Sequence, residues 1–499
     1  MPVSVVTYTI MDKKFYITTA IDYVNGPPHI GHSLEKIQAD VLARYARVNG
    51  DKVFFLTGTD EHGTKIQKMA ADQGLSPKKL ADANSKKFKD LKKVLNLSWD
   101  EFIRTTDSKK HWPGVFKIWD ALVKSGDIYK RAYRGLYCTG CESFKTESDL
   151  IEGKCPIHNK EPELVEEENY FFRLSAYSKI LKKKIEEGEL KIFPEFRSKE
   201  IISLMEKGLE DVSFSRPKEK LSWGIPVPGD DTQVIYVWAD ALTNYISAIG
   251  YARDEKEFEK WWPADVHAIG KDILRFHAAI WPAMLLSAKL PLPKKIFAHG
   301  FITVEGQKIS KSIGNVISPN DLVEKYGTDS FRYYFLREVS PFEDGDYSET
   351  KFKDRHNADL AHGLGNFAAR VAGLVGKFSH PIRNDFKNME LLLEQKIKTV
   401  QKNIDEHLFR FEFNDALSEL WSLISFGDVY INDKKPWSKE LPDAEKEKIL
   451  FNLVALLNSV GILLSPFLPE TSKSITKNIT LKGKYVQLKN IPKLFELLE

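Results

Sequence analysis

Residues 15–32, FYITTAIDYVNGPPHIGH, constrain the fold more than any other stretch of the chain. The apolar start of this stretch predicts a buried strand, its glycine and prolines predict a loop, and a helix should begin near His29. The free N–H groups at a helix N-terminus suit phosphate, and His29 and His32 can add hydrogen bonds or charge. Gly31 lets a ligand ring approach the backbone closely. The alternative is an ordinary turn with two surface histidines.

The next two patterned segments complete a parallel strand–helix–strand unit. Residues 29–49 show helical periodicity, and residues 53–56 form a second apolar run that leads into GTDEHG at residues 58–63. Ligands bind beyond the carboxyl ends of strands in such open sheets. We therefore expect three side chains that follow the strand ends to converge: Tyr23, His29 and Asp60. The alternative is that Asp60 and His62 only cap the next helix.

Composition sets wide limits on the class of protein. The chain has 499 residues, enough for about two to four domains, and 73 basic against 70 acidic residues, so its net charge of +3 neither demands nor excludes a nucleic-acid partner. The acidic residues 161–168 predict a solvated loop. We expect no membrane span, because no apolar run approaches 18 residues. Three cysteines and the lack of a secretory signal pattern favour a reducing cytoplasm.

All three cysteines lie in one short region with the spacing of metal ligands. Cys138 and Cys141 form a C-x2-C pair, and Cys155 and His158 form a C-x2-H pair after 13 intervening residues. Such paired ligands suit tetrahedral Zn²⁺, and four protein ligands leave no open position, so the metal should be structural. The alternative is a chance grouping of cysteines with a surface histidine. The sequence predicts about one zinc per chain.

A second α/β half is predicted from residue 234 onward. Residues 234–238 and 266–270 predict strands, and the second enters a helix. Residues three and four apart share a helix face, so that helix can form an apolar pocket with the segment after the first strand. The predicted pocket residues are Trp238, Tyr245, Ile273, Phe276 and His277. The alternative for this stripe is plain hydrophobic core.

A further strand is predicted at residues 296–303, and the segment KISKS at residues 308–312 follows it. Two lysines on a loop, Lys308 and Lys311, can clamp a polyphosphate through charge-assisted hydrogen bonds. The alternative is a solvated basic loop.

Residues 349–475 show helical periodicity almost throughout, which predicts a helical bundle after the α/β body. Arg370 and Trp437 could stack on unpaired RNA bases near the helix ends. The alternative is that both are packing and salt-bridge groups.

Together, and in this order, HIGH and KISKS resemble the signatures of the class I aminoacyl-tRNA synthetases. The finer motifs are similar to the methionine-specific family of the bacterial type with a single zinc knuckle. The resemblance covers residues 15 to about 470 and is carried by AIDYVNGPPHIGH (20–32), GTDEHG (58–63), the cysteine–histidine knuckle (138–158), YVWADALTNY (236–245), IGKDILRFH (269–277), KISKS (308–312), NADLAHGLGNFAARV (357–371) and KKPW (434–437).

The resemblance implies a Rossmann-like parallel-sheet catalytic domain that is interrupted by a zinc-bearing connective insertion and followed by an all-α anticodon-binding domain. The implied divisions are the first catalytic half with HIGH (1–117), the insertion with the zinc knuckle (118–233), the second catalytic half with KISKS (234–325), a stem-contact linker (326–356) and the helical bundle (357–499).

The resemblance also implies roles for individual residues. The residues that match the ATP site are His29, Gly31, His32, Glu35, Gly270, Asp272, Lys308 and Lys311, of which His29, His32, Lys308 and Lys311 would be catalytic. The residues that match the methionine pocket are Ile21, Tyr23, Asp60, Trp238, Tyr245, Ile273, Phe276 and His277. The zinc ligands would be Cys138, Cys141, Cys155 and His158. The residues that match the anticodon-reading positions are Asn366, Arg370 and Trp437.

The implied activity is methionine–tRNA ligation with ATP and Mg²⁺, on both initiator and elongator tRNA(Met). Two positions depart from the family pattern at the border of the amino-acid pocket: Asp22 stands where tyrosine or proline is commoner, and Leu242 where proline or threonine is commoner. The chain stops after the helical bundle, without the appended tRNA-binding dimerisation domain of many relatives, so we expect a cytoplasmic monomer.

Three alternatives remain at this point. One is a synthetase for another apolar amino acid, and a second is a small nucleotidyltransferase that uses the HxGH segment. The third is an RNA-binding or assembly protein built on an inactive synthetase. ATP–pyrophosphate exchange with a panel of amino acids separates all three.

Overall fold

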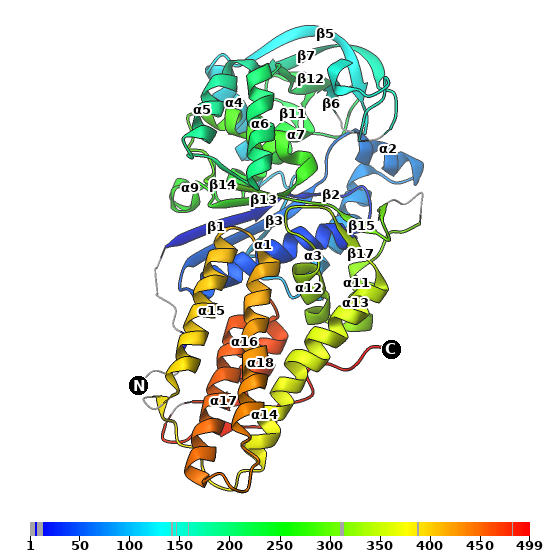
Figure 1. Ribbon diagram of the computed structural model, residues 1–499. Helices are drawn as coiled ribbons and strands as arrows, with labels where there is room; N and C mark the ends of the chain where they lie inside the picture. Colours follow the sequence, from blue (N-terminus) through cyan, green and yellow to red (C-terminus); the bar gives the residue numbers. More distant parts are fainter. Residues whose placement is uncertain are drawn as a thin grey trace.

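The computed structural model describes residues 5–6, 13–140, 143–145, 147–157, 159–309, 314–386, 389–481 and 483–499. A parallel β-sheet crosses the middle of the molecule (Figure 1). A smaller α/β region lies on one side of this sheet, and a bundle of long helices lies on the other. The predicted α/β body with a helical bundle is therefore confirmed.

The central sheet has seven strands in the order β2-β3-β1-β13-β14-β8, with β4 also paired to β3, and its ladders are all parallel. Helix α1 (Ile30–Val48) connects β1 to β3, as predicted. The strand order reverses between β1 and β13, so the crevice expected for a ligand lies at the carboxyl ends of these two strands. The strands are β1 (Lys14–Thr19), β2 (Asp22–Tyr23), β3 (Lys52–Asp60), β4 (Glu101–Arg104), β8 (Lys191–Phe193), β13 (Val266–Gly270) and β14 (Lys295–His299).

The strand predicted at residues 234–238 ends earlier than predicted and does not belong to the central sheet. Strand β12 (Asp230–Ile235) stops at Ile235, and helix α7 (Val237–Leu242) follows. This strand pairs with β10 (Ser215–Pro217) and β11 (Pro226–Val227) in a separate antiparallel sheet. An apolar run shows that a strand is buried but not which strands it pairs with.

The insertion is built on an antiparallel sheet in the order β6-β5-β7-β9. The prediction of a solvated loop at residues 161–168 is wrong, because residues 163–168 belong to β7 and pair with β5. Arg134 of β5 lies directly opposite Glu166 of β7, and Nζ of Lys130 lies 3.4 Å from Glu168; opposite charges across strands stabilise such pairs. The strands are β5 (Ile128–Cys138), β6 (Ser143–Lys145), β7 (Glu163–Phe172) and β9 (Val212–Ser213).

The strand predicted at residues 296–303 is broken at Gly300. Strand β14 ends at His299, and β15 (Ile302–Val304) joins another sheet with β16 (Gln307–Lys308) and β17 (Gly345–Tyr347). A Cβ at Gly300 would lie 2.0 Å from the carbonyl oxygen of Glu343, so this crossing of two backbones requires glycine.

Shorter helices cover the sheets and connect the halves. They are α2 (Thr64–Asp72), α3 (Pro77–Val94), α4 (Trp112–Lys124), α5 (Ser178–Glu186), α6 (Glu195–Lys207), α8 (Asn244–Ser247), α9 (Glu255–Trp261), α10 (Trp281–Ser287), α11 (Pro319–Tyr326) and α12 (Thr328–Arg337). A π-helical segment, Phe276–Ile280, leads directly into α10.

The helical bundle is confirmed. Its helix α17 is long and apolar enough to cross a membrane by length and composition, but 83% of its most apolar window is buried inside the protein, as in a core helix. The bundle comprises α13 (Glu349–Arg355), the π-helical segment His356–Gly365, α14 (Asn366–Gly376), α15 (Leu391–Phe409), α16 (Phe413–Lys434), α17 (Asp443–Leu464) and α18 (Pro469–Thr476). A short hairpin of β18 (Ile479–Thr480) and β19 (Gln487–Leu488) follows.

Two hydrophobic cores lie on opposite faces of the central sheet. Ile17 and Phe297 belong to the core that continues into α1 and the bundle, whereas their neighbours Tyr16 and Ile296 belong to the core shared with the insertion. This division follows from the alternation of side chains along a strand. The sheet therefore holds its carboxyl edge rigidly between two packed layers.

Candidate active site

One cavity of about 690 Å³ opens at the carboxyl edge of the central sheet and at the N-terminus of α1. It brings together segments from both catalytic halves, as predicted from the strand ends. Every described residue predicted for the ATP site or the methionine pocket lines it: Ile21, Tyr23, His29, Gly31, His32, Glu35, Asp60, Trp238, Tyr245, Gly270, Asp272, Ile273, Phe276, His277 and Lys308. Lys311 lies outside the described residues.

The two histidines of the HIGH segment form a reciprocal cap at the start of α1. The backbone N–H of Gly31 donates to Nδ1 of His29, and the backbone N–H of His29 donates to Nδ1 of His32, both at 3.1 Å. Because both Nδ1 atoms accept hydrogen bonds, the proton of each neutral ring lies on Nε2. The Nε2–H of His32 is therefore a donor that can face a ligand in the cavity.

His32 acts as a neutral donor rather than as a charge. Burial, together with the nearby Lys36 ammonium, lowers the pKa of His32 to about 3. The sequence left hydrogen bonding and charge open for this residue, and the structure favours hydrogen bonding. Positive charge in the cavity comes instead from side chains such as Lys65 and Lys308.

Asp22, the first departure from the family pattern, forms a buried ion pair. Its Oδ2 lies 2.5 Å from Nζ of Lys36, which is fully buried one turn beyond His32. Burial raises the pKa of Asp22, and Lys36 opposes that rise. Asp22 also lines the cavity, so a carboxylate balanced by a lysine stands at the border between the two predicted subsites. Leu242, the second departure, is buried and lines the cavity as well.

The nucleotide side of the cavity contains a histidine that the sequence analysis missed. His299 is the last residue of β14, and its Nε2 lies 3.2 Å from Oε2 of Glu35. The signal that could have found His299 is its position at a strand end, which the longer predicted strand concealed. Nearby, burial raises the pKa of Asp272, while His299 and Lys308 oppose that rise.

Aromatic rings form the opposite side of the cavity. Trp238 and Phe276 are stacked, with centroids 3.8 Å apart and planes 11° apart. The hydroxyl of Tyr245 lies 2.7 Å from Nε2 of His277, and Nδ1 of His277 donates to the carbonyl of Ile273 at 2.9 Å, so the tyrosine donates to a neutral ring. Burial lowers the pKa of His277 to about 4. The result is an apolar, shape-defining wall with fixed hydrogen bonds behind it.

The alternative that Asp60 and His62 cap the next helix is wrong. The N-cap of α2 is Gly63, and no side chain caps this helix. Asp60 ends β3 and lines the cavity, whereas His62 lies behind it against Asp240.

The predicted zinc ligands are only partly covered by the described residues. Cys138, at the end of β5, and Cys155 are both buried. Cys141 and His158 lie outside the described residues. Gly140, Pro156 and Ile157 from the same region line the cavity, so the knuckle segment forms part of the wall of the active site.

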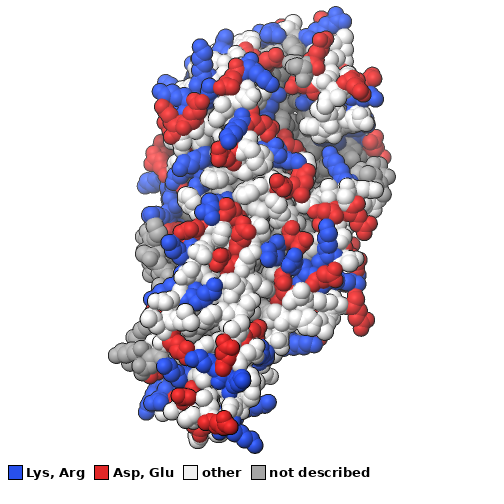
Figure 2. Space-filling view, in the orientation of Figure 1, with Lys and Arg blue, Asp and Glu red and all other residues white. Residues whose placement is uncertain are grey.

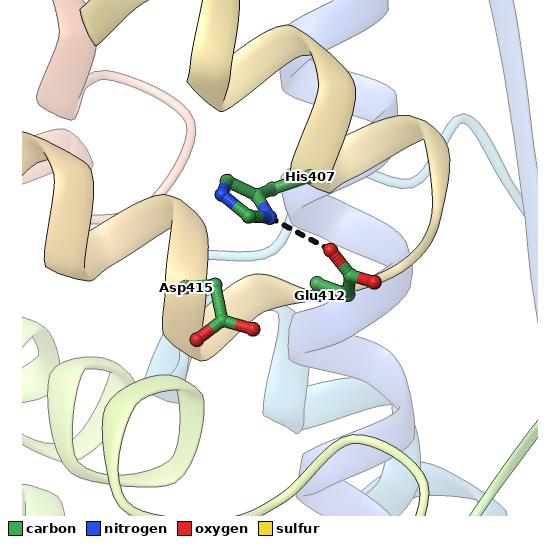
Figure 3. A group of neighbouring side chains, drawn as sticks. All are labelled: His407, Glu412 and Asp415. Carbon is green, nitrogen blue, oxygen red and sulfur yellow. Dashed lines mark hydrogen bonds and ion pairs between the residues drawn. The ribbon is translucent and has the colours of Figure 1, made fainter.

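Among the described residues, one other group could hold a metal ion: His407, Glu412 and Asp415, at the corner between α15 and α16 (Figure 3). Nδ1 of His407 lies 2.7 Å from Glu412, and the guanidinium of Arg410 donates to the same carboxylate. A cation already neutralises this carboxylate, so the group is a salt-bridged helix corner.

The three predicted anticodon residues lie on the bundle. Asn366 is exposed at the start of α14, and Trp437 is 55% exposed just beyond α16. Arg370 pairs with Asp428 and donates to Asn432 at 2.7 Å, so α14 and α16 are joined at this point. Arg370 is therefore a salt-bridge group, as the alternative interpretation predicted. Trp437 is too exposed to be a packing group.

Comparison with known proteins matches this geometry. Residues 15–161 and 145–372 fit the family model described as class I tRNA synthetases (M), and residues 391–499 fit the anticodon-binding domain of tRNA ligases. The fold and the two-sided cavity are those of a class I aminoacyl-tRNA synthetase.

The curated methionine–tRNA ligase of Caldanaerobacter subterraneus subsp. tengcongensis is 46% identical over 476 residues, covering 94% of this chain and 74% of that protein. The ligase of Thermotoga maritima is 43% identical over 480 residues, covering 94% and 76%. The chain belongs to the methionine–tRNA ligases. The structure of the Mycobacterium tuberculosis methionyl-tRNA synthetase in complex with methionyl-adenylate superposes with a TM-score of 0.91 at 37% identity, covering 97% of this chain and 99% of that one.

Proposed function

We propose that the chain joins L-methionine to tRNA(Met) in two steps, and the observation that carries this proposal is the single cavity shared by the HIGH helix and the aromatic pocket. In the first step the methionine carboxylate attacks the α-phosphorus of ATP, pyrophosphate leaves and methionyl-adenylate forms. In the second step the terminal ribose hydroxyl of the tRNA attacks the methionyl carbonyl carbon and AMP leaves.

The activation step needs positioning and charge stabilisation but no covalent nucleophile on the protein. The Nε2–H groups of His29 and His32 can donate to the phosphates, and Lys308 and Lys311 would add positive charge. Gly31 and Gly270 leave room for the nucleotide beside the backbone. Mg²⁺ would enter with ATP and neutralise its phosphates.

Methionine selectivity would come from a carboxylate and a ring-lined slot at opposite sides of the cavity. Asp60 would bind the substrate ammonium, and the stacked Trp238–Phe276 pair with Tyr245 would contact the thioether. Because one methylene changes binding in such a pocket by only about 10- to 200-fold, the rings must be held firmly to discriminate.

We also propose a structural zinc at the knuckle, supported by the metal-ligand spacing of its cysteines and histidine and by the burial of Cys138 and Cys155 in a segment that reaches the cavity. Cys141 and His158 would complete the site, and zinc would hold the cavity wall in place. We expect elemental analysis to find about one zinc per chain. Zinc-free protein with freely reactive thiols would contradict this site.

The anticodon roles of Asn366, Arg370 and Trp437 stay predictions; the match of residues 391–499 to an anticodon-binding domain and the exposure of its side chain support the role of Trp437. Use of both initiator and elongator tRNA(Met), the cytoplasmic location and the monomeric state stay predictions too.

The decisive experiment is ATP–pyrophosphate exchange across the standard amino acids, followed by charging of tRNA(Met). We expect methionine to support exchange and the other amino acids to stay near background, because the slot fits one unbranched thioether chain. Exchange that is strongest with leucine or isoleucine would contradict the methionine assignment, and exchange without charging would contradict the second step.

A further inference from the structure

A buried carboxylate flanked by two histidines lies directly behind the cavity. Asp240 is fully buried, and each of its oxygens bonds a different ring: Oδ2 lies 2.7 Å from Nδ1 of His62, and Oδ1 lies 2.7 Å from Nε2 of His111. Both histidines are buried as well. None of these three side chains lines the cavity.

The hydrogen bonds of this group define its protons. An ionised carboxylate only accepts, so Nδ1 of His62 and Nε2 of His111 carry the protons that face Asp240, and Nδ1 of His111 lies 2.8 Å from the hydroxyl of Ser247. Burial alone would raise the pKa of Asp240, but His62 and His111 outweigh that effect and lower it. Asp240 is therefore an ionised acceptor that holds two N–H donors.

The group joins three segments that are far apart in the chain. His62 follows β3, His111 immediately precedes α4, and Asp240 lies on α7. The separations are 178 residues between His62 and Asp240 and 129 residues between His111 and Asp240. A charged contact over such separations connects the first catalytic half to the second.

Each end of this connection carries one wall of the amino-acid pocket. Asp60, on the ammonium side, stands two residues before His62 and lines the cavity. Trp238 stands two residues before Asp240, and Tyr245 follows on α8; both line the same cavity as Asp60.

We propose that Asp240, held by His62 and His111, is a positioning residue that sets the span between Asp60 and the Trp238–Tyr245 wall, and thereby selects substrates by the length of their side chain. This inference rests on the proposed function. It adds a determinant of selectivity that lies outside the cavity. Rigid spacing of this kind matters because contacts alone discriminate poorly between neighbouring chain lengths.

The test is Asp240→Asn, which keeps the size of the side chain but places an amide NH₂ against a histidine N–H. In pyrophosphate exchange we expect the KM for methionine to rise about tenfold or more, as for a lost charged hydrogen bond, with the KM for ATP within about twofold. The preference for methionine over ethionine, which is one methylene longer, should fall in the same variant.

Asp329→Asn is the matched control, because Asp329 is a buried acid on α12 that accepts a hydrogen bond from the backbone of Thr471 at 2.7 Å and does not line the cavity. It should lower the melting temperature without changing the methionine KM or the ethionine ratio. If Asp240→Asn does not fold, Ser247→Ala leaves Asp240 in place and removes the outer hydrogen bond to His111 together with a long one, 3.4 Å, to the carbonyl of Asn244; it should shift both readouts in the same direction by a smaller factor.

A double-variant cycle with Asp60→Asn locates the effect. If Asp240 acts through Asp60, adding Asp240→Asn to Asp60→Asn should raise the methionine KM by much less than it does in the unmodified chain. An unchanged methionine KM and ethionine ratio in folded Asp240→Asn, while the unmodified chain exchanges with methionine, would overturn this inference and leave the proposed function standing. Failure of the unmodified chain to use methionine would instead overturn the proposed function.

Discussion

His32, His267 and His277 are neutral imidazoles in the two catalytic halves, and His267 and His277 are fully buried. Burial lowers the pKa of His32 to about 3 and that of His277 to about 4, and it holds the pKa of His267 well below its ordinary value. The hydrogen-bond partners of His267 are neutral: the hydroxyl of Thr18 at 2.7 Å and the indole of Trp281 at 3.3 Å. At the scale of single residues, these three histidines thus act as hydrogen-bonding groups without charge.

This arrangement predicts a loss of stability in acid. Because each folded pKa lies below the unfolded value of about 6.5, the unfolded chain binds protons below that pH that the native chain does not. The contribution of each histidine is complete above pH 6.5 and is lost as the pH falls, by up to about 1.4 kcal/mol per pH unit. Urea unfolding between pH 8 and pH 5 measures this slope.

His267→Gln is the variant that isolates one histidine. It removes one titrating group without touching the cavity, so the pH dependence below 6.5 should flatten by about 1.4 kcal/mol per pH unit. Asp405, whose pKa burial raises to about 6, has the opposite sign and is unchanged in the comparison. Equal slopes for the two proteins would show that His267 is protonated in the native state.

At the scale of elements, the corner between α15 and α16 fastens the bundle to the edge of the central sheet. Phe411 stacks on Phe297 of β14, with centroids 4.6 Å apart and planes 4° apart, and it meets Phe193 of β8 edge-on at 5.0 Å. Phe411 has a φ of 64°, a conformation that few residues other than glycine adopt. The contact of Glu412 with His407 (Figure 3) and its ion pair with Arg410 stabilise the same turn.

Phe411→Ala should therefore loosen this junction. Removing a buried phenylalanine costs about 3–5 kcal/mol of stability, and the loss should fall on the contact between bundle and sheet. We expect tRNA charging to decrease more than methionine-dependent pyrophosphate exchange, because exchange needs only the cavity. Phe409→Ala is the control, since Phe409 is 63% exposed and its removal should change stability little. Equal decreases in charging and exchange would contradict the junction's role.

At the scale of the whole molecule, the central sheet separates two cores, and long helices carry the far end of the bundle away from the cavity (Figure 1). Helix α16 has 22 residues and is about 33 Å long, and it begins beside the sheet, so Trp437 beyond its end lies far from the substrates. Lys, Arg, Asp and Glu side chains are intermingled on the face shown in Figure 2, which accords with the net charge of +3.

A buried arginine contacts both the bundle and α1, the helix that begins in the HIGH segment. Arg332 of α12 is fully buried, lies 2.8 Å from Asp40 of α1 and donates to the carbonyls of Pro466 and Phe467 at the start of α18. Removing one partner of the buried Arg332 guanidinium would destabilise the protein strongly, because it would leave a buried charge uncompensated. The position of the bundle is thereby tied to the helix that carries His29 and His32.

Local features could be predicted from the sequence because they depend on near neighbours. The first parallel unit and the bundle follow from hydrophobic periodicity, and the placement of His29 and His32 at a helix start follows from a strand, a loop and a helix within 18 residues. The convergence of Tyr23, His29 and Asp60 on one cavity was also predicted, because side chains after parallel strands share one edge of the sheet.

The remaining features depend on contacts between distant segments. No local pattern in the sequence indicates four of these features. They are the partners of β12, the break of β14 at Gly300, the pairing of the acidic residues of β7 with β5, and the neutralisation of Asp22 by Lys36. The sequence by itself determined the periodic elements and the identity of the chemical groups, since these are set by residues within a few turns. Only the tertiary structure decided which groups meet, as His62 and Asp240 do, because burial and long-range packing choose the partners of a buried charge.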